Sequence, residues 1–461
     1  MHIMPSFDLT TETLRTAAWG PTATQIMAAA LAAVAPYAAV QRSLVWDGTT
    51  LELAGQCYPL PSERRVLVFA TGKASILMAQ AVCDLLGERV HDGVLIYKAG
   101  SVATPPVLAP LRCYAAQHPV PDATSVAAAQ ALVQCLAQRT ADDLVLLLLS
   151  GGSSALLTLP ADGLSLSDLQ ATTTALLRCG ASIDAINTLR KHLDQVKGGN
   201  LARLAAPAQL VTLILSDVVG DALDQIGSGV SVPDSTSFAD ALAIVERYGL
   251  SEQLPASVMH RLSAGAAGLL PENPRAADPL FTRTQAVLVG SNRHAAEAAA
   301  QAAVAAGWHA LILTTRLQGE AREVGRVLAA IGREVASSAT PFVPLPACII
   351  VGGETTVTLR GSGKGGRNQE LALGAVRDLA GVPNVALLTL ATDGDDGPTD
   401  AAGAVVTGAT LARAQAAGLD LDAALAHNDA YPFFAALGDL LQPGATGTNV
   451  SDLALLLVWP A

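Results

Sequence analysis

Short apolar runs alternate along this chain with alanine-rich stretches of helical pattern, and this alternation limits the possible folds more than any other feature. Several runs are almost continuously apolar, as strands buried on both faces of a sheet are. Helical patterns such as Ser75–Leu86 and Ala295–Ala306 lie between them. The alternation predicts an α/β protein with mostly parallel sheets. The predicted strands are Val66–Ala70, Gly93–Tyr97, Asp143–Leu149, Leu210–Leu215, Gln285–Val289, Ala310–Thr314, Cys348–Val351, Thr355–Leu359, Val385–Ala391 and Leu453–Val458.

The length of the chain predicts two domains. Its 461 residues are too many for one compact core. A polar stretch with several Pro and Gly residues, Ser263–Phe281, is the candidate boundary. We therefore predict a larger, Rossmann-like N-terminal domain over residues 1–265 and a smaller α/β domain over residues 266–461. Ligands of open α/β sheets bind beyond the carboxyl ends of strands, so the loops that follow strands are the candidate sites.

The charge and the cysteines exclude several classes of protein. A net charge of −12 provides no general attraction for nucleic acid or for an anionic membrane. The six cysteines are scattered without a C-x-x-C pair, which indicates a reducing compartment and no zinc site. The apolar run over residues 26–40 follows a leader of mixed charge and contains Pro36, so it fits neither a signal peptide nor a membrane span. We expect a cytoplasmic protein.

The lysines are few and unusually placed. Only five of the 28 basic residues are lysines, and four of these lie within two residues of a glycine. Lys73, in TGKAS, follows a predicted strand and precedes a predicted helix. A cation at a helix N-terminus is locally unfavourable because the helix dipole prefers an anion there, and a bound anion would compensate for it. The alternative is a solvated lysine in an exposed loop. Lys73 is our first candidate for a catalytic cation.

A serine–glycine loop follows another predicted strand. In LLLLSGGSSALL, the residues Ser150–Ser154 combine two glycines with three serines. Glycines let the backbone approach a ligand, and successive N–H groups together with hydroxyls bind phosphate oxygens. The alternative is a tight strand-to-helix turn, which needs glycine but not three serines. We interpret the loop as a phosphate site.

Aspartates follow two further predicted strands. Asp217 begins the loop in LILSDVVGD, and Asp393 begins the loop in ATDGDDGPTD. Carboxylates at strand ends hold Mg²⁺ or accept a proton from a substrate hydroxyl. Asp-Gly pairs also occur in ordinary tight turns, so this pattern leaves both interpretations open.

The stretch RGSGKGGRNQE has two competing interpretations. Gly361, Gly363 and Gly366 match a G-x-G-x-x-G dinucleotide fingerprint. That fingerprint needs an acidic residue about 20 positions further on, where this chain reads GVPNVAL. Lys364 and Arg367 instead fit an anion site that combines a point charge with a bidentate fork. No strand is followed by a Walker A sequence, so the pattern excludes a P-loop kinase.

These motifs together resemble the class II glycerate 2-kinases. The segments GGETTVTLRGSGKGGRNQELAL, ATDGDDGPTDAAGAVV and HNDAYPFFAALGDLLQPGATGTNVSDLALLL look like the MOFRL domain of that family, over about residues 345–458. LLLLSGGSSALL, INTLRKHLDQVKGGNLARL, LILSDVVGD, FATGKAS and HPVPD look like its larger N-terminal domain. One departure is Asp194, where the family usually has Ser. The resemblance covers nearly the whole chain after about residue 20.

The resemblance implies ATP-dependent phosphorylation of D-glycerate at its 2-hydroxyl, with Mg²⁺, in a cleft between the domains. It implies a monomer or homodimer whose partners are these small molecules. Two other functions are kept as alternatives. An NAD(P)H-dependent hydroxypyruvate reductase would need the missing dinucleotide site, and a non-catalytic hydroxy-acid-binding protein would need only a carboxylate site.

The expected roles combine the resemblance with the motifs. Lys73, Arg367 and Asp217 are the expected catalytic residues, and Asp217 and Asp393 are the candidate metal ligands. The residues expected to bind the nucleotide are Gly72, Ser150, Gly151, Gly152, Ser153, Ser154, Lys191, Lys197, Gly363, Lys364 and Gly365. The residues expected to bind glycerate are Arg190, Arg367, Glu354 and Asn449.

Overall fold

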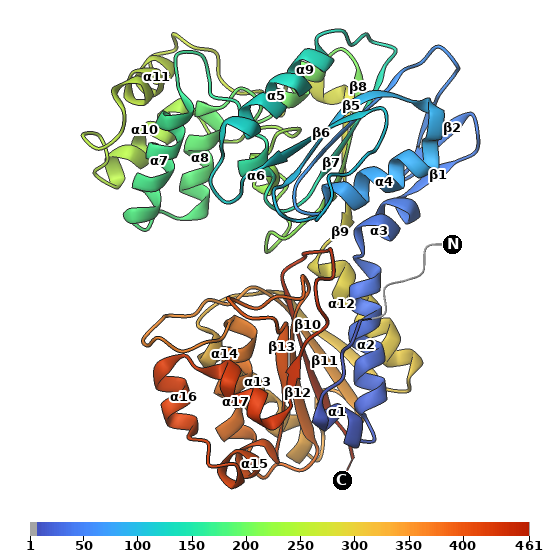
Figure 1. Ribbon diagram of the computed structural model, residues 1–461, viewed down its shortest axis with the longest axis vertical. Helices are drawn as coiled ribbons and strands as arrows, with labels where there is room; N and C mark the ends of the chain where they lie inside the picture. Colours follow the sequence, from blue (N-terminus) through green and yellow to red (C-terminus); the bar gives the residue numbers. More distant parts are fainter. Residues whose placement is uncertain (1–6, 461) are drawn as a thin grey trace. The chain divides into compact units, whose positions relative to one another are not determined.

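The computed structural model describes residues 7–460, which form two compact units (Figure 1). One unit spans Pro36–Val289, and the other combines the residues before Pro36 with those from Gly290 onward. The contacts between residues therefore divide the chain before Pro36 and after Val289, whereas the predicted domain boundary lies after residue 265. The Pro- and Gly-containing stretch does not end the first unit because the next strand, β9 (Thr284–Gly290), still joins the first sheet.

The first unit contains a six-stranded sheet with the order β6-β5-β4-β7-β8-β9. The pairings from β6 to β8 are parallel, and β4 and β7 are buried along their whole length, as their apolar runs predict. The carboxyl ends of these five strands therefore meet at one edge of the sheet. Besides β9, the strands are β4 (Val66–Thr71), β5 (Val90–Lys98), β6 (Leu111–Ala116), β7 (Leu144–Leu149) and β8 (Gln209–Leu215).

Helices and a small antiparallel sheet complete this unit. Helices α7, α8, α10 and α11 form a bundle with its own apolar core around Leu189 and Phe238 (Figure 1). The helices are α3 (Pro36–Ser43), α4 (Ser75–Leu86), α5 (Ala123–Leu136), α6 (Ser153–Leu156), α7 (Leu166–Arg178), α8 (Ile183–Leu193), α9 (Asn200–Ala205), α10 (Phe238–Arg247) and α11 (Ala256–Ala266). The small sheet contains β1 (Leu44–Trp46), β2 (Thr50–Leu53) and β3 (Gln56–Pro59).

The second unit contains a mixed sheet, so the prediction of mostly parallel sheets is wrong here. Its order is β10-β11-β15-β12-β13-β14, and only β10 and β11 pair in parallel. The last strand of the chain inserts antiparallel between β11 and β12, which alternation of strands and helices does not reveal. The strands are β10 (His309–Leu317), β11 (Ala347–Gly353), β12 (Val385–Ala391), β13 (Gly403–Thr407), β14 (Leu440–Leu441) and β15 (Asp452–Val458).

The helices of the second unit come from both ends of the chain. Helix α2 packs against α12, and α13 packs closely against α14, where Gly325 faces the carbonyl of Leu371 and Gly374 faces that of Arg322. The helices are α1 (Glu12–Thr16), α2 (Gly20–Ala33), α12 (Asn292–Ala305), α13 (Ala321–Ser337), α14 (Arg367–Leu379), α15 (Thr410–Ala416), α16 (Leu421–His427) and α17 (Ala430–Leu437).

Nine of the ten predicted strands are present, and the exception is Thr355–Leu359. Its backbone forms an isolated bridge, in which Thr356 pairs with Glu320, and is otherwise bonded to a side chain. The Glu320 carboxylate accepts the N–H of Thr358 at 3.1 Å, and just beyond the segment the N–H of Arg360 donates to Asn428 Oδ1 at 2.7 Å. The β-branched pattern here therefore belongs to an extended loop.

The early apolar run forms α2 and α3, with a break between them. In the part of the chain that the structure describes, no single helix is long and apolar enough to cross a membrane. Helices α2 and α3 pass that test only as a pair, by length and composition, and they bend by 62° at the break.

Candidate functional site

The predicted loops of the first unit gather at one edge of its sheet. Lys73 follows β4, Ser150 follows β7 and Asp217 follows shortly after β8. Lys98 ends β5, and His118 lies two residues beyond β6. Because these strands are parallel, the five loops share the carboxyl edge of the sheet, where ligands of such sheets bind.

Two of the three predicted phosphate-binding serines hold the loops together. Ser150 Oγ accepts the N–H of Ala74 at 3.0 Å, and Ser153 Oγ donates to the carbonyls of Thr71 (2.9 Å) and Ser150 (2.5 Å). Both side chains are buried. The structure therefore gives Ser150 and Ser153 a structural role that the sequence did not predict. The half-buried Ser154 accepts a hydrogen bond from Ser228 Oγ at 3.0 Å and remains the hydroxyl available to a ligand.

The glycines of these loops make room for side chains from neighbouring strands. A Cβ on Gly72, whose φ is +124°, would lie 2.1 Å from Ser150 Oγ. A Cβ on Gly151 would lie 2.0 Å from Asp217 Oδ2. Gly152, with a φ of +88°, lies against His118, whose Cδ2 would be 3.1 Å from an added Cβ. These glycines bring a carboxylate and an imidazole into the edge where Lys73 lies.

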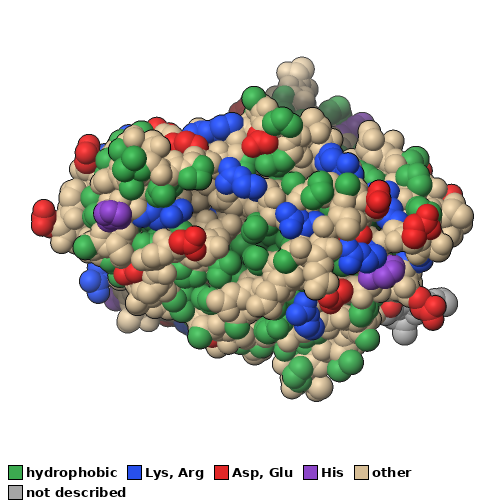
Figure 2. Space-filling model, turned by 90° about the horizontal axis from the view of Figure 1, so that it is seen from above, with side chains coloured by type: hydrophobic (Ala, Val, Ile, Leu, Met, Phe, Trp, Pro, Cys, Tyr) green, Lys and Arg blue, Asp and Glu red, His purple; other side chains and the backbone are tan. Residues whose placement is uncertain are grey.

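Three cations surround this edge without an ion-pair partner among residues 7–460: Lys73, Lys98 and Arg190. The Arg190 side chain donates one long hydrogen bond within the described chain, to Asn187 Oδ1 at 3.4 Å. Burial lowers the pKa of Arg190, with Asp194 acting in the opposite direction. On the face shown in Figure 2, by contrast, Lys and Arg side chains are interspersed with Asp and Glu. This group of unpaired cations is therefore a candidate site for an anion.

Asp217 is a buried carboxylate whose charge interacts with that of Lys73. Burial raises the pKa of Asp217, and the charge of Lys73 opposes that shift. No group of three or more His, Cys, Asp and Glu residues that could hold a metal ion occurs among the described residues. The side chains present thus do not build a metal cage, and the assignments of Asp217 and Asp393 to Mg²⁺ stay predictions.

The predicted phosphate contacts of Lys191 and Lys197 are not supported, because both ammonium groups are buried in ion pairs. Lys191 Nζ lies 3.2 Å from Asp224 Oδ2 and 3.3 Å from Asp234 Oδ1. Lys197 Nζ donates to Asp194 Oδ2 at 2.5 Å and to a backbone carbonyl. Burial lowers the pKa of Lys197, and Asp194 opposes this shift. These lysines hold the helical part of the unit in place.

In the second unit, Arg367 begins α14 and binds protein carboxylates. Its Nε and Nη2 donate to Asp452 at 2.5 and 3.0 Å, and its Nη1 lies 2.9 Å from Glu354. Burial alone would lower the pKa of Arg367, but the hydrogen bonds and charges of Asp452 and Glu354 raise it. The guanidinium group that we predicted to bind a ligand in a bidentate manner therefore binds Asp452 in this way, and Glu354, predicted to bind glycerate, is an ion-pair partner of Arg367.

A buried carboxylate caps the helix that carries Arg367. The Asp396 oxygens accept the N–H groups of Asn368 (3.1 Å) and Gln369 (2.9 Å), in place of an N-cap side chain on Gly366. Burial raises the pKa of Asp396 to about 6, although these two backbone hydrogen bonds oppose the shift. Asp396 thus fixes the start of α14 and, with it, the backbone position of Arg367, the first residue of this helix.

The glycine-rich turn before Arg367 packs against other loops of its own unit. Its predicted phosphate-binding amides are used internally, since Gly363 N–H donates to the carbonyl of His427 and Lys364 N–H to Asp429 Oδ1. An added Cβ on Gly363 would lie 2.5 Å from the same carbonyl. The Lys364 ammonium lies 4.0 Å from the centre of the Tyr431 ring, a cation–π contact. The turn is neither a dinucleotide fingerprint nor a backbone phosphate cradle, and no contact seen here marks Gly365 as a ligand.

Asn449 and Asp393 lie in loops next to the sheet of the second unit. Asn449 Oδ1 accepts the N–H of Ser451, whose φ is +67°, and Asp393 Oδ1 accepts the N–H of Asp395 at 3.3 Å. These local bonds leave their ligand roles as predictions.

Sequence reasoning missed His118 as a member of the site. The strand before it, β6, has the mixed sequence LRCYAA and was not among the predicted strands. Without β6, nothing placed the HPVPD segment at the carboxyl edge. The sequence signal for His118 is its position two residues after β6, a strand that ends in the buried Ala116.

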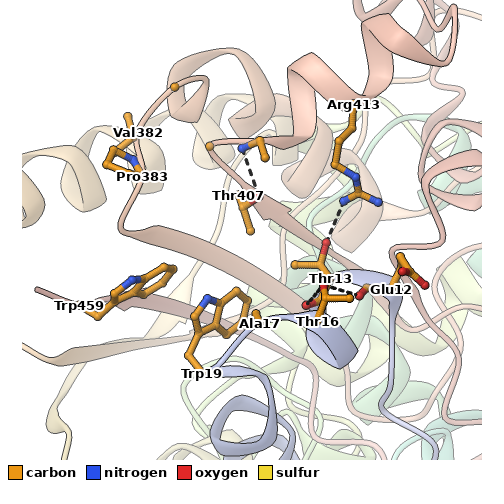
Figure 3. A pocket seen from close by; sticks show the side chains of 13 residues that line it. Glu12, Thr13, Thr16, Ala17, Trp19, Val382, Pro383, Thr407, Arg413 and Trp459 are labelled. Atoms are coloured by element: carbon orange, nitrogen blue, oxygen red, sulfur yellow. Dashed lines mark hydrogen bonds between the residues drawn. The ribbon is translucent and has the colours of Figure 1, made fainter. Parts of the chain in front are cut away.

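A pocket of about 590 Å³ lies in the second unit, with Trp19 and Trp459 along one side and Arg413 on the other (Figure 3). The Arg413 guanidinium is held by Asp439 and Thr13. Trp459 follows the end of β15, whereas Asp452, the partner of Arg367, begins that strand. Seven residues of strand separate the pocket from Arg367 by about 20 Å, so the two are distinct.

Comparison with known proteins identifies the family. Residues 22–263 match a domain of unknown function, DUF4147, and residues 347–452 match the MOFRL family. A protein of Thermotoga maritima named D-glycerate 2-kinase is 42% identical over 86% of this chain and 91% of its own length. The chain belongs to the class II glycerate kinase family.

Other members of the glycerate kinase family support the same fold and carry a second name. A solved structure of a glycerate kinase from Thermotoga maritima matches with a TM-score of 0.84 and 40% identity, over 95% of this chain and 99% of that one. A protein of Agrobacterium vitis, 42% identical over 86% of this chain and 87% of its own length, is provisionally named a hydroxypyruvate reductase. The predicted α/β fold and family are confirmed.

Proposed function

We propose that this protein transfers the γ-phosphoryl group of ATP to the 2-hydroxyl of D-glycerate, giving 2-phosphoglycerate and ADP. The observation that carries the proposal is the group of unpaired cations, Lys73, Lys98 and Arg190, at the carboxyl edge of the first sheet. Phosphoryl transfer is catalysed largely by positioning and by stabilising charge on the phosphoryl oxygens. Unpaired cations beside glycine loops supply such stabilisation.

The roles follow from the position of each group. Lys73 neutralises the transferring phosphoryl group, and Arg190 binds the second anionic group, the glycerate carboxylate. Asp217 accepts the hydroxyl proton as the bond from O2 of glycerate to the γ-phosphorus forms and the bond to the bridging oxygen of ADP breaks. The charge of Lys73 opposes the rise in the pKa of Asp217, which favours the carboxylate form that this step requires.

In the second unit, Arg367 is the candidate for a catalytic cation. Its Nη1 lies 2.9 Å from Glu354, whose side chain is 43% exposed, so an incoming anion can replace Glu354 while Asp452 keeps the guanidinium oriented. If Lys73 and Arg367 act on the same phosphoryl group, the effects of Lys73→Met and Arg367→Lys on kcat should be strongly non-additive. Additive effects would indicate separate roles.

Magnesium enters with the nucleotide in this proposal. Mg²⁺ in kinases is commonly bound by one or two carboxylates together with substrate phosphates. In the proposal, Asp217 would support such an ion from the first unit, and the ion would neutralise phosphate charge. The absence of a carboxylate cluster among the described residues supports an ion held chiefly by ATP.

Two measurements test the reaction and its position. ADP release from ATP, Mg²⁺ and D-glycerate, compared with NADH oxidation with hydroxypyruvate, separates the kinase from the reductase. Product that enolase converts without a mutase is 2-phosphoglycerate. A requirement for the mutase would overturn the 2-position, and hydride transfer from NADH without ATP turnover would overturn the kinase. Binding of D-glycerate without either reaction would indicate the non-catalytic alternative.

A further inference from the structure

His118, in the HPVPD segment, lies at the proposed anion site, and the proposed mechanism gives it no role. It lies two residues beyond β6, and its ring packs against Gly152 of the serine–glycine loop. An added Cβ at Gly152 would lie 3.4 Å from His118 Nε2 and 3.5 Å from Lys73 Cγ. The imidazole and the aliphatic stem of Lys73 therefore flank the same residue of the loop. Within residues 7–460, neither ring nitrogen has a hydrogen-bond partner.

The charges around the half-buried ring are nearly all positive. Lys73 faces it from the loop before α4, Lys98 from the end of β5 and Arg190 from α8. The serine–glycine loop that it touches contains no charged residue, and Asp217 lies on the other side of that loop, against Gly151. Burial first, and then these three cations, lower the pKa of His118 to about 4. The ring is therefore neutral at neutral pH when no anion is bound.

A bound oxyanion would reverse the electrostatic environment of this ring. The negative charge would offset the three cations, and its oxygens would accept hydrogen bonds from ring N–H groups that lack a partner in the protein. A neutral imidazole offers one N–H, whereas the protonated ring offers two. An anion in the site thus favours the protonated ring over the neutral one.

We propose that His118 is a further anion-binding residue of this site and that it takes up a proton when a phosphate-type dianion binds beside Lys73, Lys98 and Arg190. This inference rests on the proposed function only in requiring that the edge binds an anion. Because linkage is reciprocal, the dianion binds more tightly as pH falls through the pKa of the liganded His118. Each unit by which the ligand raises this pKa corresponds to about tenfold tighter binding to the protonated protein.

The test is NMR titration of the histidine rings of the full chain between pH 4 and 8, with and without sulfate. Sulfate is a dianion that does not itself titrate in this range, so proton uptake is assigned to the protein. His118→Asn identifies the signal of His118, and His91, exposed near the start of β5, is the internal control. We expect saturating sulfate to raise the pKa of His118 by at least about one unit, a tenfold linkage, and to leave the His91 signal in place.

The outcomes separate this inference from the proposed function. If sulfate perturbs signals of the site in the wild type but not in Lys73→Met, and the pKa of His118 does not rise, the role of His118 is refuted and the anion site remains. If neither sulfate nor ATP perturbs the site, the proposed anion site is itself refuted.

Discussion

Replacing Lys73 by Met should lower kcat by about a thousandfold while leaving the fold unchanged. Among the described residues the Lys73 ammonium forms no ion pair, so its removal breaks no salt bridge of the fold, although the buried Asp217 loses the favourable charge of Lys73. In the reaction the lost contact is between a full positive charge and the phosphoryl oxygens. At a separation of about 4 Å and an effective dielectric constant of about 20, this contact is worth about 4 kcal/mol. That energy corresponds to about three powers of ten in rate.

The same substitution should change the pH dependence of the reaction. Lys73 opposes the burial-driven rise in the pKa of Asp217, so its removal raises that pKa further. If Asp217 accepts the hydroxyl proton, the acid limb of the kcat profile shifts to higher pH, and the deficit of Lys73→Met relative to wild type becomes smaller as pH rises. His118 should also gain basicity, because Lys73 is one of the cations that lower its pKa.

The assay is chromatographic measurement of ADP formed from ATP, Mg²⁺ and D-glycerate, with circular dichroism to verify folding. Arg112→Met serves as the matched control, because it removes a partly exposed cation near the other end of the same sheet, where Arg112 faces Asp92 at 3.7 Å. A folded Lys73→Met with kcat within about threefold of wild type would refute the argument, because a transition-state charge contact cannot be lost at so small a cost.

Three further substitutions test the remaining contacts. Arg367→Lys keeps the charge but cannot reproduce the bidentate bond to Asp452, so kcat should fall at least about a hundredfold; recovery of most activity with lysine would show that only the charge matters. Asp194→Ala leaves the buried Lys197 unpaired, so the free energy of unfolding of the first unit should fall by about 3–5 kcal/mol in urea titrations; a loss below about 1 kcal/mol would contradict this. The raised pKa of Asp396 makes the folded state bind its proton more tightly than the unfolded chain, a stabilising effect present at low pH and lost as pH rises through about 6. Asp396→Asn should therefore be less sensitive to pH than wild type between about 4 and 6, as followed by the urea midpoint.

The sequence predicted the strands best where burial is complete. β4, β7 and β12 are buried along their whole length, and their continuous apolar runs located them within one residue. β6 was missed because its exposed positions break the apolar run, and with it the position of His118 was missed. The direction of β15 also escaped prediction, because pairing between distant segments is a tertiary property that periodicity does not carry.

Two glycine–lysine turns of similar sequence have different surroundings, because different segments of the chain pack against them. Around Lys364, the HND segment at the end of α16 accepts hydrogen bonds from the backbone N–H groups of the turn, and the ring of Tyr431 contacts the Lys364 ammonium. Around Lys73, the neighbouring loop receives backbone hydrogen bonds but supplies no carboxylate or ring to the ammonium. A lysine beside glycine therefore predicts an anion site only when the surrounding fold leaves the lysine unpaired. Whether the lysine is paired depends on residues that lie 65 to 80 positions away in the sequence. At Lys73, the neighbouring residues are brought close by the parallel order of β4, β7 and β8. The ion pairs of Lys191 and Lys197 show in the same way that a lysine in a sequence motif can serve the fold alone.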